Sequence, residues 1–307
     1  MVLLLHSAPA NKKNIKKSIT VLLCIFCCIF SLCASGTSEE QLYVSFLDVG
    51  QGDATLIKQG NRCVLIDGGE NPQIIHSILE KNGITDIEAV IASHNDSDHI
   101  GGLADVLKFR NVKKLYLSQD EKIYTRAYEN MILYAESNKT KILYPKTGDS
   151  IKIGKVKITF IGPISKYNNS NDSSLCTRID YGSTSFLLMG DSSIDVEDEI
   201  IDINPQAVNC TVLKVNHHGA EHSTGYRLLR EAKPNYAIIS VGKNNNYGHP
   251  SESVISRLYD YKKSNPVFTL YRTDMQGTIT FVSDGTQIVE VVVERNQYSA
   301  DVYKEKD

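Results

Sequence analysis

The amino-acid sequence predicts an α/β protein with four layers, in which two β-sheets lie between two layers of helices (an α/β/β/α sandwich). Strand-like apolar runs and amphipathic helix-like stretches alternate from residue 41 to residue 295, as in proteins whose sheets are covered by helices. Several strand-like runs also follow one another directly, so they must pair as hairpins within mixed sheets. The chain of 307 residues is long enough for such a core, and no long linker divides residues 41–295.

The first half of this region contains three adjacent strands and then alternating helices and strands. In the first predicted helix, the side chains of Ile74, Ile75, Ile78 and Leu79 lie on one face. Strands are predicted at residues 43–49, 54–58, 63–66, 88–92 and 113–117, and helices at residues 72–82, 97–109 and 123–137.

The second half is richer in strands and ends in a short tail. Strands are predicted at residues 141–144, 155–161, 175–181, 185–189, 211–215 and 236–241 and near 267–271, 277–282 and 287–293. Helices are predicted at residues 195–201, 224–232 and 251–261. Residues 296–307 are predicted to be a C-terminal tail outside the domain, which spans residues 37–295.

The first 36 residues are predicted to be an export leader. Four lysines between residues 12 and 17 precede an uncharged apolar run at residues 19–33, and the small residues Ala34, Ser35 and Gly36 follow. This order is typical of a signal peptide, and the run is short for a membrane-spanning helix of about 20 residues. A lipoprotein leader with Cys33 as the lipidated residue ranks second, because Leu32 is a poor residue before such a cysteine, and an uncleaved anchor ranks third. Each interpretation predicts a secreted or extracytoplasmic domain, with membrane attachment through the leader as the alternative.

The charge and the cysteine content argue against two classes of protein, a strongly basic nucleic-acid-binding protein and a protein built on a disulfide framework. The net charge of -3 gives no basic footprint, so any binding to nucleic acid must depend on a local patch or on metals. Four of the seven cysteines lie in the leader, and the odd number that remains (Cys63, Cys176 and Cys210) does not indicate a disulfide framework. We expect these three cysteines to be small buried apolar residues.

Polar side chains gather at six places where predicted strands end. They are the stretches 48–53, 67–69, 94–99, 217–219 and 247–250 and the single residue Asp191. Open α/β folds place their sites at the carboxyl ends of strands. Each stretch alone could be a turn. However, six of the eight histidines (His94, His99, His217, His218, His222 and His249) fall at these places or next to them, which favours a metal site.

The order of these motifs resembles the metallo-β-lactamase fold superfamily. More narrowly, "FLDVGQGDATLI", "SHNDSDHIGGL", "LLMGD" and "LKVNHHG" resemble the C-terminal hydrolase domain of ComEC-type competence proteins. The resemblance extends from about residue 42 to residue 293, and it implies the four-layer sandwich of the metallo-β-lactamase type. The family's multi-spanning channel has no counterpart here, so the chain is expected to be a stand-alone, exported form of this domain.

The resemblance implies a site for two divalent metal ions, zinc or manganese, that hold a hydroxide. His94 and Asp96 would bind one ion, Asp98 and His99 the second, and Asp191 both. Either His217 or His218 would complete the second set. Asp98 and His249 are expected to take part in catalysis. A supporting role, in the second shell or at the substrate, is expected for Asp48, Gln51, Asp53, Asp67, Asn171 and Tyr247.

Two departures from the superfamily pattern affect the first ion. Asp96 stands where most of the superfamily has a second histidine, a change that ComEC-type domains share. No histidine lies between His99 and His217, and a stretch containing Asn171 occupies that region. The first ion would therefore have fewer imidazole ligands than the second.

The first functional hypothesis is an extracytoplasmic metal-dependent phosphodiesterase or nuclease, with DNA as the substrate that the resemblance implies. A second is a phosphodiesterase acting on cell-envelope polymers such as choline-decorated teichoic acids, or an ester or lactam hydrolase. A third, of another class, is a non-catalytic metal-binding module, which is disfavoured because the ligands of the second ion are all present. No protein partner can be inferred from the sequence.

Overall fold

Two β-sheets form the inner layers of the protein, which a computed structural model describes over residues 41–119 and 125–295. The first sheet has the strand order β17 (Ile288–Val293), β16 (Ile279–Ser283), β1 (Leu42–Phe46), β2 (Thr55–Gln59), β3 (Arg62–Ile66), β5 (Ala89–Ala92), β7 (Lys114–Leu117) and β8 (Lys141–Leu143). The second has the order β15 (Thr269–Arg272), β14 (Tyr236–Ile239), β13 (Val212–Lys214), β12 (Thr184–Leu188), β11 (Cys176–Tyr181), β10 (Val156–Gly162) and β9 (Ser150–Ile153). The short strands β4 (Asp86–Ile87) and β6 (Asn111–Val112) pair with each other.

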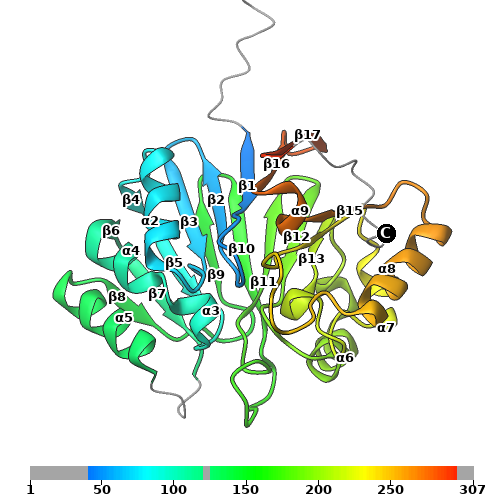
Figure 1. Cartoon of the computed structure of the whole chain (residues 1–307), viewed down its shortest axis with the longest axis horizontal. Helices are drawn as coiled ribbons and strands as arrows, with labels where there is room; N and C mark the ends of the chain where they lie inside the picture. The colour runs from blue at the N-terminus through cyan, green and yellow to red at the C-terminus, as the bar shows by residue number, and fades with distance from the viewer. Residues whose placement is uncertain (1–40, 120–124, 296–307) are drawn as a thin grey trace, which may run out of the picture. The chain divides into compact units, whose positions relative to one another are not determined.

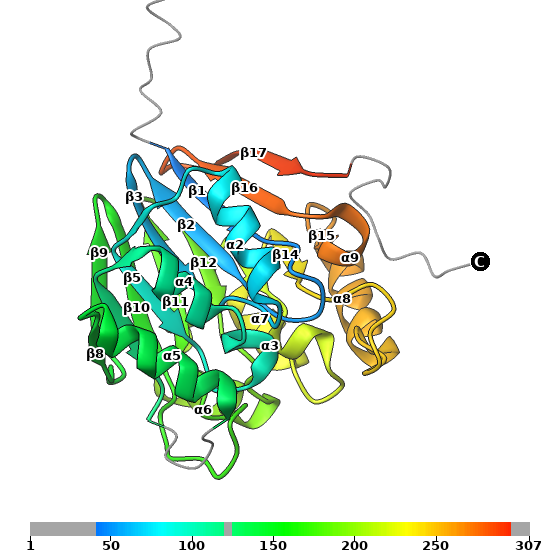
Figure 2. The same ribbon diagram turned by 60° about the vertical axis from the view of Figure 1, so that its left-hand side comes forward.

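Helices cover the outer face of each sheet. The helices α2 (Pro72–Lys81), α4 (Leu103–Phe109) and α5 (Arg126–Ser137) lie over the first sheet, as Figures 1 and 2 show. The helices α6 (Ile194–Ile203), α7 (Tyr226–Ala232) and α8 (Glu252–Ser264) lie on the side of the second sheet. Three apolar clusters fill the spaces between these four layers. The central cluster contains Phe46, Phe160, Phe186 and Phe281, contributed by both sheets. This arrangement confirms the predicted α/β/β/α sandwich.

Parallel strands in both sheets decide where the loops gather. The strands β3, β5, β7 and β8 are parallel, as are β12 to β15. Strands of this kind are covered on both faces, which explains why all four residues of β5 are apolar and buried. The carboxyl ends of parallel neighbours lie at the same edge of a sheet, so the loops after β3 and β5 approach one another, and so do those after β12, β13 and β14.

The predicted elements occur in the expected order, with a few differences. The predicted helix 97–109 is two helices, α3 (Ser97–Ile100) and α4, separated by Gly101 and Gly102. A Cβ atom at Gly102 would lie 2.3 Å from the Gly68 carbonyl oxygen, so the helical segment is interrupted where it meets the loop after β3. The strands β4, β6 and β9, the helix α9 (Thr273–Gln276) and the short 3₁₀ helices η1 (Pro205–Ala207) and η2 (Asn216–Gly219) were not predicted.

Several sequence predictions concern parts of the chain beyond these elements. The predicted leader (1–36) and tail (296–307) lie outside the described residues, and so does the start of the helix predicted at 123–137. Among the described residues, no helix is both long and apolar enough to span a bilayer. Cys63, Cys176 and Cys210 are free and buried, as expected, and burial raises the pKa of the Cys176 and Cys210 thiols to about 12.

Candidate metal centre

Backbone hydrogen bonds between three loops fix the frame of the centre. The Asp53 N–H donates to the Asp98 carbonyl (3.0 Å) and the Gly68 N–H donates to the His99 carbonyl (2.7 Å). Gly52 has a φ of +121°, and a Cβ atom there would lie 2.0 Å from the Asp98 carbonyl oxygen. Only glycine allows so close an approach in that conformation. The "GQGD" stretch therefore holds the His94–His99 loop in place.

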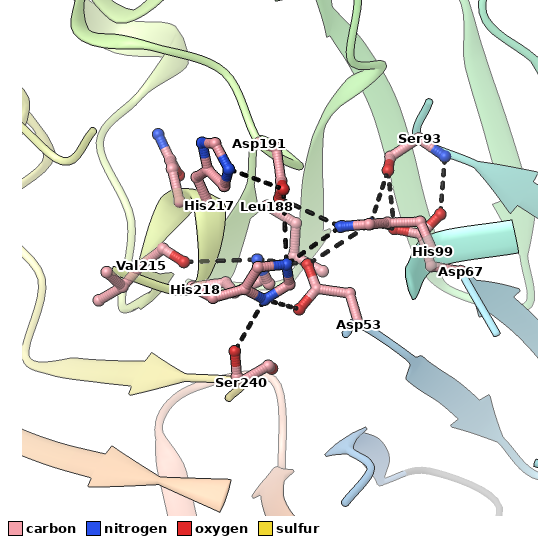
Figure 3. A network of polar contacts seen from close by, with 12 residues as sticks. Asp53, Asp67, Ser93, His99, Leu188, Asp191, Val215, His217, His218 and Ser240 are labelled. Atoms are coloured by element: carbon pink, nitrogen blue, oxygen red, sulfur yellow. Dashed lines mark hydrogen bonds and ion pairs between the residues drawn. The ribbon is translucent and has the colours of Figure 1, made fainter. Parts of the chain in front are cut away.

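Four histidines turn one ring nitrogen toward Asp191, which follows β12 and is buried. Figure 3 shows three of them, His99, His217 and His218. The Nε2 atom of His99 lies 3.2 Å from Asp191 Oδ1. The Nε2 atoms of His218, His217 and His94 lie 3.4, 3.6 and 4.0 Å from Asp191 Oδ2. Residues that are up to 124 positions apart in the sequence thus converge on one carboxylate.

The opposite ring nitrogen of each buried histidine already has a partner. His99 Nδ1 lies 2.9 Å from Asp67 Oδ2, and His218 Nδ1 lies 2.9 Å from the Ser240 carbonyl oxygen. Both partners are acceptors, so both Nδ1 atoms carry the proton and donate it. His94 Nδ1 lies 3.0 Å from Ser93 Oγ. This pattern is the one that orients a histidine for metal binding through Nε2.

The geometry of the Nε2 atoms fits a divalent cation. His99 Nε2 and His218 Nε2 face each other at 3.3 Å, although two neutral rings protonated at Nδ1 would direct lone pairs at each other. His94 Nε2 is buried and accepts no hydrogen bond from any described residue. In the protein alone, burial disfavours the charged ring, yet Asp191 and Asp67 raise the pKa of His99 well above its ordinary value. The cluster thus needs positive charge, which an ion would supply.

Of two possible ligand groups, the one with Asp191 has the better donor set. His94, His99 and Asp191 offer one ligand atom each, all within 4.8 Å of one another. The ligand atoms of Asp53, His99 and His218 also lie within 4.8 Å of one another. However, the Asp53 carboxylate faces the Nδ1 atoms of the two rings, at 3.8 Å for His99 and 3.5 Å for His218. Those atoms already donate to Asp67 and Ser240, which makes Asp53 a supporting residue, as its sequence position suggested.

Asp96 and Asp98 approach the cluster from its more exposed side. Asp96 Oδ2 lies 3.7 Å from His94 Nε2, and Asp98 Oδ2 lies 3.2 Å from His218 Nε2. Burial alone would raise the pKa of Asp98, but the bond to His218 and the charge of His99 lower it to about 2. All seven residues that the sequence suggested as ligands therefore lie in one cluster.

The adjacent histidines of η2 differ in their surroundings. Both have left-handed backbone conformations, with φ values of 49° and 52°. Such strain persists only where neighbours enforce it, and it concentrates at functional sites. The His218 side chain is 2 % exposed and anchored through Nδ1, whereas the His217 side chain is 32 % exposed and its ring lies 5.7 Å from that of His249. His218 is therefore the better placed ligand of the two.

The six predicted supporting residues occupy different places. Asp67 orients His99, and it also accepts from the Ser93 N–H. Gln51 accepts from the Gly242 N–H (3.1 Å), which ties it to the loop carrying Tyr247. Asn171 accepts from Ser174 Oγ through its carbonyl oxygen.

Asp48 differs from the other supports, because its carboxylate pairs with Arg295. It also lines a cavity of about 590 Å³ beside β1 and α2 rather than the cluster. No described contact links it to the candidate metal ligands.

Four residues of the centre were not suggested by the sequence. Ser93 and Ser174 are buried hydroxyl residues beside His94, and Ser174 Oγ also accepts from the Asp191 N–H. Lys214 is 2 % exposed at the end of β13, and its Nζ contacts Asp53 Oδ2. A lysine within the otherwise apolar stretch 212–215 was the available signal. Burial alone would raise the pKa of Asp53, but Lys214 and His218 hold it below its ordinary value.

The fourth residue, Glu197 of α6, clamps the loop that carries the adjacent histidines. Its Oε1 accepts from Asn216 Nδ2 (2.7 Å) and from the Thr224 N–H (2.5 Å), and its Oε2 accepts from the Gly225 N–H (2.8 Å). The side chain is fully enclosed, and burial raises its pKa to about 7 in spite of these donors. Glu197 thus anchors both ends of the segment 216–225.

Glu197→Gln is expected to lower the free energy of unfolding by about 1–3 kcal/mol, because an amide cannot accept all three hydrogen bonds. The pKa adds a dependence on pH. Between pH 4.5 and about 7 the folded protein keeps a proton that the unfolded chain releases, so wild-type stability falls as pH rises through this window. Glutamine does not titrate, so the variant lacks this contribution to the change of unfolding free energy with pH. Urea titrations of both proteins at several pH values test it, and parallel curves would contradict the assignment.

Comparisons with known proteins concern the family of the chain. The family model described as "Metallo-beta-lactamase superfamily" matches residues 47–243. Among curated proteins, the chain is 30% identical over 277 residues to ComE operon protein 3 of Bacillus subtilis and 32% identical over 259 residues to Recombination protein 2 of Haemophilus influenzae. It is 29% identical over 248 residues to competence protein ComA of Neisseria gonorrhoeae. These matches cover 79–81% of this chain but 30–33% of each relative, so the chain spans about a third of their length.

Solved structures share the fold at low identity. The metallo-β-lactamase fold protein YhfI from Bacillus subtilis matches with a TM-score of 0.51 at 15% identity, over 79% of this chain and 100% of that one. CmlA, a diiron β-hydroxylase from Streptomyces venezuelae, matches with a TM-score of 0.54 at 11% identity, over 80% of this chain and 54% of that one. The family model covers well over half of the sequence and includes all seven candidate ligands. The chain belongs to the metallo-β-lactamase superfamily of metal-dependent hydrolases.

Proposed function

We propose that the protein is an extracytoplasmic metal-dependent phosphodiesterase that uses two divalent ions. The observation that carries the proposal is the convergence of four imidazole Nε2 atoms on Asp191, with the carboxylates of Asp96 and Asp98 beside two of those atoms. Mixed nitrogen and oxygen donors suit zinc and manganese. A pair of such ions supplies an activated water and the positive charge that displacement at a phosphodiester requires.

Two of the protein's own side chains could act on the substrate, Asp98 as an anion and His249 as a neutral imidazole. Asp98 is ionised at neutral pH, because its pKa is lowered to about 2, and as an anion it can accept a hydrogen bond from water in the centre. Burial, with the charges of His217 and His218, lowers the pKa of His249. A neutral His249 at the edge of the cluster can donate a hydrogen bond from its ring N–H to the leaving oxygen.

The names of relatives favour DNA as the substrate. Relatives bear the names of a competence protein and a recombination protein. With a net charge of -3, the protein depends on the metal centre and on short-range contacts to attract a polyanion. Export is supported by the basic and apolar order of residues 12–36.

The test is a parallel assay of the metal-loaded protein on bis-p-nitrophenyl phosphate, single-stranded DNA, duplex DNA, a choline-phosphate polymer and a β-lactam. We expect turnover of bis-p-nitrophenyl phosphate and of DNA with zinc or manganese. Turnover of the lactam alone would overturn the proposal, and so would inertness toward every substrate with each metal, which would favour a binding module.

The two metal positions should differ in affinity, and Asp96→His tests this. Asp96 is the partner of His94 and is 41 % exposed, so this position has more oxygen and less imidazole than the one near His218. We expect one tightly held ion in the wild type and a second that exchanges and responds to manganese. Asp96→His should tighten the weaker zinc position by about tenfold, ~1.4 kcal/mol, and reduce stimulation by manganese.

Metal content by mass spectrometry, together with zinc titrations, checks this expectation. Asp195→His, at an exposed position of α6, is the matched control for an added imidazole and should change neither quantity. Two equally tight ions in the wild type, unchanged by Asp96→His, would contradict this account.

A further inference from the structure

A row of aromatic rings leads from the metal centre to the protein surface. The His217 ring is followed by the His249 ring at 5.7 Å in an edge-to-face arrangement. The Tyr247 ring lies 5.8 Å from that of His249, with only 20° between the ring planes. His217 Nε2 lies 3.6 Å from Asp191 Oδ2, so the row begins at the cluster itself. It ends at Tyr247, which is 68% exposed.

The loop that presents the last two rings is held by a dense set of hydrogen bonds. Asn245 Nδ2 donates to the carbonyls of Gly242 (3.1 Å) and His249 (2.6 Å), and Asn245 Oδ1 accepts from the N–H groups of Tyr247 (3.1 Å) and His249 (3.0 Å). One side chain thus binds the loop at both ends. The backbone at Tyr247 is therefore held by the protein itself.

Two further contacts tie this loop to the centre. Gln51, from the loop between β1 and β2, accepts from the Gly242 N–H. At the other end, the Ser251 N–H donates to the Gly219 carbonyl (2.9 Å), directly after the adjacent histidines. A Cβ atom at Gly219 would lie 2.6 Å from Pro250 Cβ, so the two turns touch. The loop that carries the exposed ring is consequently tied to the segment that carries His217 and His218.

We propose that Tyr247, backed by His249, is a stacking site for a nucleobase of single-stranded nucleic acid next to the phosphodiester that is cleaved. This inference rests on the proposed phosphodiesterase function and narrows its substrate class. One face of the Tyr247 ring is turned to His249, and its exposure leaves surface for a flat partner. Aromatic faces bind bases of any sequence, and a base in a single strand is free to stack, whereas a base in a duplex is already stacked on its neighbours.

The ring chemistry favours a base over the choline group of an envelope polymer. A quaternary ammonium is usually held within a cage of several aromatic faces. Here the rings follow one another in a row, and Tyr247 offers a single exposed ring. A row of this kind suits a flat aromatic group better than a round cation.

The experiment compares KM and kcat of the metal-loaded full chain on a short oligothymidylate, a same-length abasic strand and the matching duplex. Tyr247→Ser should raise KM for the oligothymidylate by about tenfold with little change in kcat, which is within the range measured for loss of one base–aromatic stack. Its KM for the abasic strand should stay at the wild-type value. Tyr247→Phe should behave as the wild type, because the ring remains. Tyr259→Ser, which removes an exposed ring on α8, is the matched control.

The outcomes separate this inference from the function on which it rests. If the wild type cleaves no phosphodiester, bis-p-nitrophenyl phosphate included, the proposed function fails. If the wild type cleaves DNA while Tyr247→Ser keeps the wild-type KM for the oligothymidylate, the stacking site alone is wrong. A loss of activity in Tyr247→Phe would overturn it in favour of a role for the hydroxyl. An effect of Tyr247→Ser only on a choline-phosphate polymer would overturn it in favour of cation binding.

Discussion

Asp191→Ala is expected to abolish hydrolysis of every substrate, with a fall in kcat/KM of more than about a hundredfold, the upper range for losing even an outer partner of a metal site. Asp191 is the carboxylate on which His94, His99 and His218 converge, and it is 4 % exposed. Its removal leaves these rings without a shared anion, so metal content should fall together with activity. Mass spectrometry of the purified protein and a phosphodiesterase assay provide the two measurements.

The metal-free protein gives a second, independent readout of the same substitution. Asp191 is the foremost charge that raises the pKa values of His99 and His218 against the effect of burial. Asp191→Ala should therefore lower both values, which titration by NMR detects. Asp195→Ala, at an exposed position in the first turn of α6, is the control and should leave activity and metal content unchanged. Near wild-type activity of Asp191→Ala would show that the centre is organised around a different carboxylate.

Lys214→Met is expected to cost about 3–5 kcal/mol of unfolding free energy in metal-free protein near neutral pH, the range for removing one partner of a buried ion pair. Lys214 and Asp53 are 2 % and 4 % exposed at their side chains, and the substitution leaves the Asp53 carboxylate buried without its ammonium. The wild-type pKa of Asp53 is lowered, so the pair's contribution is complete above pH 3.8 and is lost as pH falls through the folded-state pKa. The difference in unfolding free energy between the wild type and the variant should therefore become smaller at acidic pH. Urea denaturation in the presence of a chelator measures it.

Two companion variants separate loss of the pair from loss of a side chain. In Lys214→Met combined with Asp53→Asn, no buried charge remains unpaired, so part of the stability should return. Lys263→Met removes the ammonium of an exposed pair with Asp260 and should change stability very little. If Lys214→Met alone were as stable as the wild type, the ammonium would not be what keeps Asp53 ionised.

The sequence predicted the layers of the fold because periodicity reflects which face of each element is buried. It could not predict the break between α3 and α4. The apolar positions run on through Gly101 and Gly102, but the carbonyls of Asp98 and His99 accept from the N–H groups of Asp53 and Gly68, which lie in other loops. The extra strand β9 shows the alternation of exposed and buried residues over only four positions, too few to stand out in the sequence.

The candidate metal ligands were predicted because their types and spacing form recognisable motifs, whereas two of the supporting residues, Lys214 and Glu197, were not predicted. Lys214 lies in a strand that otherwise appears purely apolar, and its partner Asp53 is 161 positions away. Glu197 lies on the same helix face as Val196, Ile200 and Ile201, where a burial argument would have predicted it. For Asp48, the strand end was identified correctly, but the direction of its side chain is set by the pairing with Arg295, 247 residues later. The identity of such long-range partners leaves no local signal.

The candidate ligands come from both sheets. His94, Asp96, Asp98 and His99 follow β5 of the first sheet, whereas Asp191, His217 and His218 follow β12 and β13 of the second. An ion held by both sets is a cross-link between the two halves of the sandwich, and its binding free energy is also folding free energy. At a free concentration one hundred times its dissociation constant, such an ion adds about 2.7 kcal/mol to stability. If such an ion is bound, the concentration of metal around the protein would contribute to its stability against unfolding as well as to its rate of turnover.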